Sequence, residues 1–230
     1  MDKYVVPIAI LIAGALIAGA VFFNGYRTNT VKEGNPDNPG TGQADNEAYK
    51  NVKAVSKDDH ILGDANAKIK IVTFSDMECP YCIKFEATMR QIVPDYKGKV
   101  AWVYRHTPLD FHKNAMPAAL ASECVAEKGG EAKFWEFMEK VTAALEGKTG
   151  VVLSMGDVAN EIGVDKAFVE KCVSDKKYES RVSDNQNDSF ASGLQGTPYS
   201  VVIVDGKPVQ SIDGAYPIDE VKGIIDGYLK

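Results

Sequence analysis

The feature that most constrains the fold is a pair of cysteines, Cys79 and Cys82, placed between an apolar run and an amphipathic pattern. The run before them, residues 69–74, is rich in β-branched side chains and is typical of a buried strand. After them, apolar residues recur at spacings of three and four, which predicts a helix that Pro94 kinks or ends. A second apolar run at residues 100–104 predicts the next strand. These pieces form a βαβ unit, with parallel strands and a right-handed crossover.

The place of the pair at the start of a predicted helix suits it to redox chemistry. Unpaired backbone N–H groups and the positive end of the helix dipole favour a thiolate there, which lowers the pKa of the first cysteine. We therefore predict that Cys79 is the nucleophile and that Cys82, nearly one turn later, is the resolving cysteine. Pro80 fixes φ near its helical value. It has no backbone N–H group, and at the start of a helix such a group would have no partner within the helix.

Two other interpretations of the pair are half of a zinc site and two inert thiols at an exposed junction between loop and helix. A structural zinc site needs four ligands, commonly two close-spaced pairs, and the sequence offers no second such pair. We therefore predict no metal and no cofactor.

The amino terminus contains 19 residues without a charge, Val5 to Phe23, which is long enough for a helix to cross a bilayer. We predict a transmembrane signal anchor at about 5–23, within residues 1–23. A cleaved signal peptide is the alternative, because Ala18-Gly19-Ala20 offers small residues for cleavage. The basic residues on the two sides do not decide the orientation.

Residues 24–50 have the composition of a solvated linker, and residues 51–230 form the folded domain. The whole chain has 26 basic and 32 acidic residues, a net charge of −6, which gives no electrostatic basis for binding nucleic acid. With 45% hydrophobic residues, it is not a disordered or fibrous protein.

The second half of the domain reads as a helical insert at about 112–193, followed by a hairpin and a closing helix. Glycines near 129–130, 147–150 and 163 break the helical pattern. Asp205-Gly206 is a two-residue turn signal between the apolar run 199–204 and its partner, and Pro217 suits the start of the last helix.

The order of these elements resembles that of the thioredoxin superfamily, and more closely that of the DsbA-type thiol-disulfide oxidoreductases. The resemblance covers about 60–230 and rests on five segments in the correct order: FSDMECPYC, YRHTPLDFHKNA, ASEC, KCVSDKKY and GTPYSVVIVDG. It implies an α/β fold of the thioredoxin type, in which a central mixed sheet is flanked by helices and carries an inserted helical subdomain. One transmembrane helix would precede this fold.

The resemblance also assigns roles near the second proline motif. It implies that Pro198 is a cis-proline beside the cysteines and that Thr197 and Pro198 bind an extended substrate peptide, with Pro80 and Tyr81 also contacting substrate. The alternative is an ordinary trans proline that starts an edge strand. Thr73 stands where many relatives have a buried acid that aids proton transfer, which is a departure from the pattern.

The two remaining cysteines, Cys124 and Cys172, lie on predicted helices and point toward the interior of the insert. We predict a structural disulfide between them, with two buried free thiols as the alternative. A disulfide would indicate an oxidising compartment, because such bonds are rare in the cytoplasm.

Other polar residues near the motifs are predicted to stay outside the catalytic set. Acids raise the pKa of a nearby thiolate, so Asp76 and Glu78 are interpreted as solvated side chains. His106 and His112 are interpreted as structural or solvated, and His60 carries no signal.

These observations predict a monomeric, single-pass membrane protein with an extracytoplasmic catalytic domain, an oxidase that donates the Cys79–Cys82 disulfide. Its expected partners are exported proteins with free cysteines and a quinone-linked membrane re-oxidase. The direction of net disulfide transfer stays open, because Pro80 and Tyr81 between the cysteines give the same CPYC motif as the reducing glutaredoxins. The alternatives are a reductase or isomerase of the same fold, or a tethered peptide-binding module without redox activity.

Overall fold

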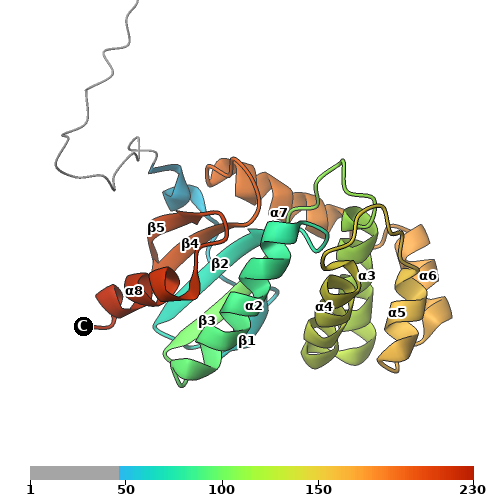
Figure 1. Cartoon of the computed structure of the whole chain (residues 1–230), viewed down its shortest axis with the longest axis horizontal. Helices are drawn as coiled ribbons and strands as arrows, with labels where there is room; N and C mark the ends of the chain where they lie inside the picture. The colour runs from blue at the N-terminus through green and yellow to red at the C-terminus, as the bar shows by residue number, and fades with distance from the viewer. Residues whose placement is uncertain (1–46) are drawn as a thin grey trace, which may run out of the picture. The chain divides into compact units, whose positions relative to one another are not determined.

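A five-stranded mixed sheet forms the centre of the computed structural model, which describes residues 47–230 (Figure 1). Its order is β1-β3-β2-β4-β5, with β2 in the middle. β2 pairs in parallel with β3, which confirms the predicted βαβ unit, and antiparallel with β4. The strands are β1 (His60–Gly63), β2 (Ile69–Ser75), β3 (Val100–His106), β4 (Tyr199–Val204) and β5 (Lys207–Asp213).

One face of the sheet is covered by α2 and α8 (Figure 1). The predicted apolar stripe of α2 is buried, with Phe85 and Met89 packed over Ile71 and Trp102. Pro94 lies inside α2, one residue before its end. The helices are η1 (Glu47–Asn51), α2 (Pro80–Asp95), α3 (Ala115–Gly129), α4 (Glu131–Leu145), α5 (Met155–Glu161), α6 (Lys166–Ser174), α7 (Glu179–Ala191) and α8 (Ile218–Tyr228).

The other face of the sheet is covered by the amino-terminal segment of the described chain. Val72, Phe74 and Val201 pack there against Val52 and, at the edge, Tyr49. The short helix η1 therefore contributes to the domain, although the composition of residues 24–50 predicts a linker up to residue 50. Residues 47–50 of the predicted linker therefore belong to the folded domain, since Tyr49 packs against the sheet, and residues 24–46 lie outside the described part of the chain.

The predicted helical insert is confirmed, with one correction. Helices α3 to α6 form a bundle beside the sheet, and α7 runs from this bundle back along the sheet (Figure 1). Because α7 packs on β3 and β2, the last predicted helix of the insert belongs partly to the sheet domain. The glycine breaks fall where the sequence places them, and a further turn at Lys176, with φ of 53°, separates α6 from α7.

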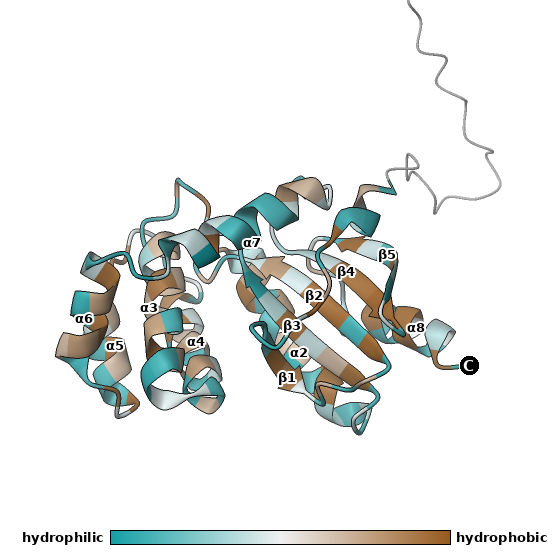
Figure 2. Ribbon diagram, turned by 180° about the vertical axis from the view of Figure 1, so that it is seen from behind, coloured by the Kyte–Doolittle hydropathy of each residue, from teal (hydrophilic) through white to brown (hydrophobic). Residues whose placement is uncertain are grey.

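The apolar residues are concentrated along the strands and the inner helix faces (Figure 2). Phe134 and Trp135 of α4 lie in the same core cluster as Trp102 and Tyr104 of β3, so the cores of the insert and the sheet are continuous. The two tryptophan rings are 5.1 Å apart, which confirms that both serve packing.

The predicted membrane segment at about 5–23 lies outside the described residues. Within residues 47–230, no helix combines the length and apolar character that crossing a bilayer requires.

Candidate active site

The cysteine pair lies where β2 gives way to α2. Cys79 is the residue that caps the amino terminus of α2, with extended backbone angles, and Pro80 is the first helical residue. Both sulfurs are free thiols. The expectation of an exposed junction is wrong for the cysteines themselves, since Cys79 is only 5% exposed and Cys82 3%, whereas Tyr81 between them is 68% exposed. The Cys79 side chain is therefore buried, whereas that of Tyr81 projects into solvent.

The environment of Cys79 favours its thiolate. The side-chain hydrogen bond from Cys82 is the main cause that lowers the pKa of Cys79 to about 6, while partial burial opposes the shift. The backbone N–H groups of Cys82 and Tyr81 act in the same direction as that hydrogen bond. These amides belong to the first turn of α2, so the predicted effect of the helix terminus is present.

The environment of Cys82 favours its neutral thiol. Burial is the main cause that raises the pKa of Cys82 well above its ordinary value, and the adjacent Cys79 sulfur adds to it. The Asp76 N–H, which donates to Cys82 Sγ at 3.4 Å, and the Ser75 hydroxyl partly offset this rise. The two cysteines are therefore unequal at neutral pH: the Cys79 thiolate is favoured, as the predicted role of nucleophile requires, and Cys82 keeps its proton.

The second predicted motif lies against the first. The peptide bond between Thr197 and Pro198 is cis, and the Cys79 sulfur contacts the carbonyl oxygen of Thr197 at 3.5 Å. The Thr197 hydroxyl lies close enough to this sulfur to favour the thiolate, although within residues 47–230 it makes no hydrogen bond of ordinary geometry. Antiparallel pairing of Phe74 with Tyr199 brings these two segments together.

The departure at Thr73 has a structural explanation. Thr73 is fully buried on β2, and its hydroxyl shares a hydrogen bond of 2.9 Å with the hydroxyl of Ser200 on β4. A hydroxyl pair between adjacent strands satisfies both buried groups without a charge. This position therefore supplies no acid or base to the cysteine pair.

Asp76 is the functional-site residue that the sequence interpretation placed wrongly. It is 1% exposed rather than solvated, and its carboxylate accepts hydrogen bonds from the Leu109 amide at 2.9 Å and from His112 Nδ1 at 2.8 Å. Glu78 is likewise engaged, since its carboxylate accepts the Asn114 amide at 2.5 Å. The sequence signal that could have found this contact is the acid at the end of a buried strand.

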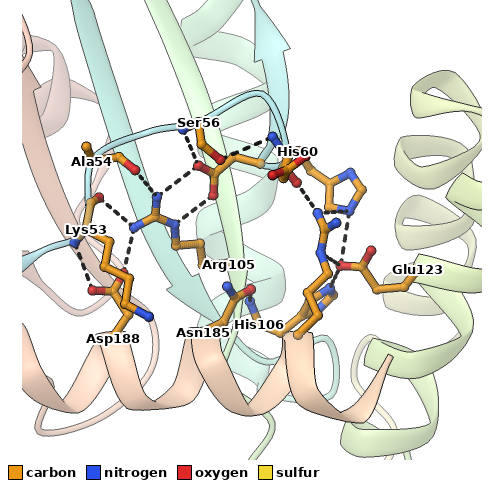
Figure 3. Close-up of polar contacts among 12 residues, drawn as sticks. Lys53, Ala54, Ser56, His60, Arg105, His106, Glu123, Asn185 and Asp188 are labelled. Atoms are coloured by element: carbon orange, nitrogen blue, oxygen red, sulfur yellow. Dashed lines mark hydrogen bonds and ion pairs between the residues drawn. The ribbon is translucent and has the colours of Figure 1, made fainter. Parts of the chain in front are cut away.

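The other two histidines meet at the carboxylate of Glu123 (Figure 3). His106 Nε2 lies 3.0 Å and His60 Nε2 3.2 Å from the same oxygen of Glu123, and Arg181 Nε donates to that oxygen at 2.8 Å. Burial alone raises the pKa of Glu123, but hydrogen bonds from the histidines hold it below its ordinary value. A cation in this triangle would have to displace the guanidinium. His106 is structural, as predicted, and no spacing in the sequence marks His60.

Arg105 joins the amino-terminal segment to the sheet and to α7 (Figure 3). It forms a two-pronged ion pair with Asp59, at 2.8 and 2.9 Å, and a second ion pair with Asp188 at 2.6 Å. It also donates to the carbonyl oxygens of Lys53 and Ala54. This buried arginine is fully paired, as a buried charge must be.

The second pair of cysteines forms a disulfide. Cys124 of α3 and Cys172 of α6 are bonded, with their Cα atoms 6.1 Å apart, so the predicted pairing is present. Both residues lie inside the helical insert, and the bond therefore ties two of its helices together without touching the Cys79 site.

Comparison with known proteins agrees with this geometry. A thioredoxin family model matches residues 55–227. The solved structure of DsbA2 from Pseudomonas aeruginosa is 26% identical, with a TM-score of 0.63 over 76% of this chain and 96% of that one. BdbD from Bacillus subtilis in its oxidised form is 24% identical, with a TM-score of 0.63 over 77% and 96% of the two chains, and shows the same fold. So does the thiol-disulfide exchange protein alpha-DsbA2 from Wolbachia pipientis, 21% identical with a TM-score of 0.61 over 73% and 85%.

Curated relatives share the domain within much longer proteins. Na(+)/H(+) antiporter NhaA 3 of Salinispora tropica is 31% identical over 61% of this chain, and NhaA 1 of Salinispora arenicola is 30% identical over 61%. The chain spans only 21% of the length of either relative. With residues 55–227 matched by the thioredoxin family model, the chain belongs to the thioredoxin family, and its solved structural neighbours include DsbA-type proteins.

Proposed function

We propose that the chain is an oxidase that donates its Cys79–Cys82 disulfide to exported proteins. The observation that carries this proposal is the inequality of the two cysteines: a pKa of about 6 for Cys79 and a pKa well above 9.0 for Cys82. A stabilised Cys79 thiolate stabilises the reduced form of the pair, and a pair whose reduced form is stable gives its disulfide away readily.

The substrate is an extended peptide segment that carries a free cysteine. Cis-Pro198 directly precedes β4, and the carbonyl oxygen of Thr197 before it lies 3.5 Å from the Cys79 sulfur. Exposed Tyr81, two residues after Cys79, offers an apolar contact next to the pair. In this proposal a peptide strand lies along Thr197 and Pro198, with Pro80 and Tyr81 contacting its side chains.

The reduction potential tests the direction of the reaction. The full chain, purified in detergent, is equilibrated in glutathione buffers, and the Cys79–Cys82 pair is read by alkylation and mass spectrometry. A potential of about −120 to −180 mV supports an oxidase, whereas one of about −230 to −270 mV assigns the chain to the reductases. If Cys79 and Cys82 never form a disulfide, the proposal fails and a peptide-binding module replaces it.

We further propose that the domain acts outside the cytoplasm, held by the apolar segment at residues 5–23. The Cys124–Cys172 disulfide supports this location, because structural disulfides persist in oxidising compartments. A quinone-linked membrane protein would restore the Cys79–Cys82 disulfide after each turnover. Labelling of intact cells with a thiol reagent that does not cross membranes tests the location: Cys79 of reduced protein reacts if the domain is outside and stays unlabelled if it is inside.

A further inference from the structure

The Asp76 carboxylate is held from two segments of the chain although it lies beside the cysteine pair. Within its own turn it accepts the Glu78 amide at 2.7 Å. From the loop between β3 and α3 it accepts the Leu109 amide at 2.9 Å and His112 Nδ1 at 2.8 Å. The His112 side chain is 17% exposed, and that of Asp76 is completely buried. These three hydrogen bonds fix the Asp76 side chain in one orientation.

The backbone of Asp76 faces the resolving cysteine. Its N–H donates to Cys82 Sγ at 3.4 Å, in a site where Cys82 is almost completely buried. A sulfur without water depends on protein donors to carry negative charge. An N–H group held in place before the reaction can supply that stabilisation without a cost of reorganisation.

We propose that Asp76 and His112 are positioning residues, whose mutual hydrogen bond holds the Asp76 N–H on the Cys82 sulfur so that Cys82 can leave or attack as a thiolate. The proposal rests on the redox role of the Cys79–Cys82 pair and extends it. It assigns a function to a histidine and an acid that lie outside the pair itself, and it explains why a carboxylate is tolerated beside two thiols.

The role given to Asp76 agrees with the movement of electron pairs in the exchange reaction. A client thiolate attacks Sγ of Cys79 in the disulfide form, a new S–S bond joins client and Cys79, and the Cys79–Cys82 bond breaks. Its electron pair remains on Cys82, which becomes the thiolate that the Asp76 N–H faces. A second client thiolate then attacks the client sulfur of the mixed disulfide and releases the Cys79 thiolate, while Cys82 takes a proton from solvent.

Two half-reactions of the full chain in detergent separate a positioning role from a general structural role. In the first, reduced glutathione attacks the oxidised protein, and Cys82 must leave. In the second, a Cys82→Ser protein attacks oxidised glutathione through Cys79, and Cys82 takes no part. We expect His112→Ala to slow the first half-reaction about tenfold, the effect of one lost hydrogen bond to a charged group, and to change the second less than about twofold.

Matched variants complete the test. His112→Asn can still donate to Asp76 and should restore the parent rate, and Lys113→Ala, at the exposed neighbouring position, should match the parent in both half-reactions. If His112→Ala does not fold, Asp76→Asn keeps the side-chain size and carries the same expectation. Equal slowing of both half-reactions, or slowing of neither, overturns the positioning role. The direction of net transfer does not enter, so an unexpected reduction potential would overturn the oxidase proposal and leave this result standing.

Discussion

The chain's four cysteines form two pairs in opposite surroundings. Cys79 and Cys82 lie at a junction between a strand and a helix, within reach of unpaired N–H groups, and are held as free thiols with unequal pKa values. Cys124 and Cys172 are 48 positions apart in the sequence and join two packed helices. Because a disulfide stabilises the folded state more when it closes a longer loop, the second pair is suited to structure and the first to exchange.

The largest expected effect concerns the nucleophile. Cys79→Ser should abolish disulfide transfer to a reduced peptide, because no other described thiol has a lowered pKa at this helix terminus. The double variant Cys124→Ala, Cys172→Ala is the matched control and should keep the specific activity of its folded fraction. Peptide oxidation followed by mass spectrometry measures both. Residual transfer by Cys79→Ser would show that the two pairs are not separate in function.

The same double variant should show the converse effect on stability. Loss of the Cys124–Cys172 bond should lower the free energy of unfolding by as much as roughly 4 kcal/mol, as expected for a closed loop of this length. Urea unfolding measures the difference. The loss should appear as a lower urea midpoint of the double variant than of the parent, both measured with the Cys79–Cys82 pair in the same redox state; equal midpoints would remove the structural role of the Cys124–Cys172 pair.

A pH profile should separate the cysteines of the reactive pair. With a pKa of about 6, Cys79 should react with iodoacetamide at a rate that rises between pH 5 and pH 7 and then levels off. Since the folded pKa lies below the ordinary value of 9.0, the reduced protein gains stability as pH rises above about 6, in full above about 9, and loses it as pH falls through 6. Melting temperatures of parent and Cys79→Ser proteins across this range check the sign, and a difference that shrinks toward pH 9 would contradict it.

The smallest expected effect on the fold comes from the exposed residue between the reactive cysteines. Tyr81→Ala should change the free energy of unfolding by less than about 0.5 kcal/mol, because the ring is 68% exposed. It should still weaken binding of a client peptide to a Cys82→Ser protein, which titration calorimetry measures. Val152→Ala, at a position of 68% exposure in the insert, is the matched control. Unchanged peptide affinity would remove Tyr81 from the substrate-binding surface.

The parts of the fold that sequence predicts best are those with strong local patterns. The β-branched run of β2, the stripe on α2 and the Asp205-Gly206 turn each carry their own signal, and all are present. The four residues of β1 carry none, because an edge strand this short has no room for a repeat. The packing of η1 against the sheet could not be predicted either, because this five-residue segment is polar in composition and too short for a repeat.

In the site, residue types with intrinsic chemistry could be predicted and their supporting contacts could not. The cysteines and the Thr-Pro motif can be recognised from the sequence alone. Asp76 looks like a surface acid in the sequence, and its burial depends on contacts with Leu109 and His112 from a distant loop. The meeting of His60 with Glu123 joins positions far apart in the chain, and no local pattern encodes such a contact.

The two halves of the active site are carried by neighbouring strands of one sheet. Phe74 of β2 pairs with Tyr199 of β4, so the spacing between Cys79 and Pro198 is set by a single hydrogen-bonded ladder. The register of this ladder fixes the spacing, because a slip of β4 by one residue would displace Pro198 by about 3.3 Å. The same slip would turn every side chain of β4 to the opposite face of the sheet. The helical insert begins and ends outside this ladder. Insertions, deletions or hinge motions in the insert can therefore vary what the domain binds while the distance across which sulfur is exchanged stays fixed.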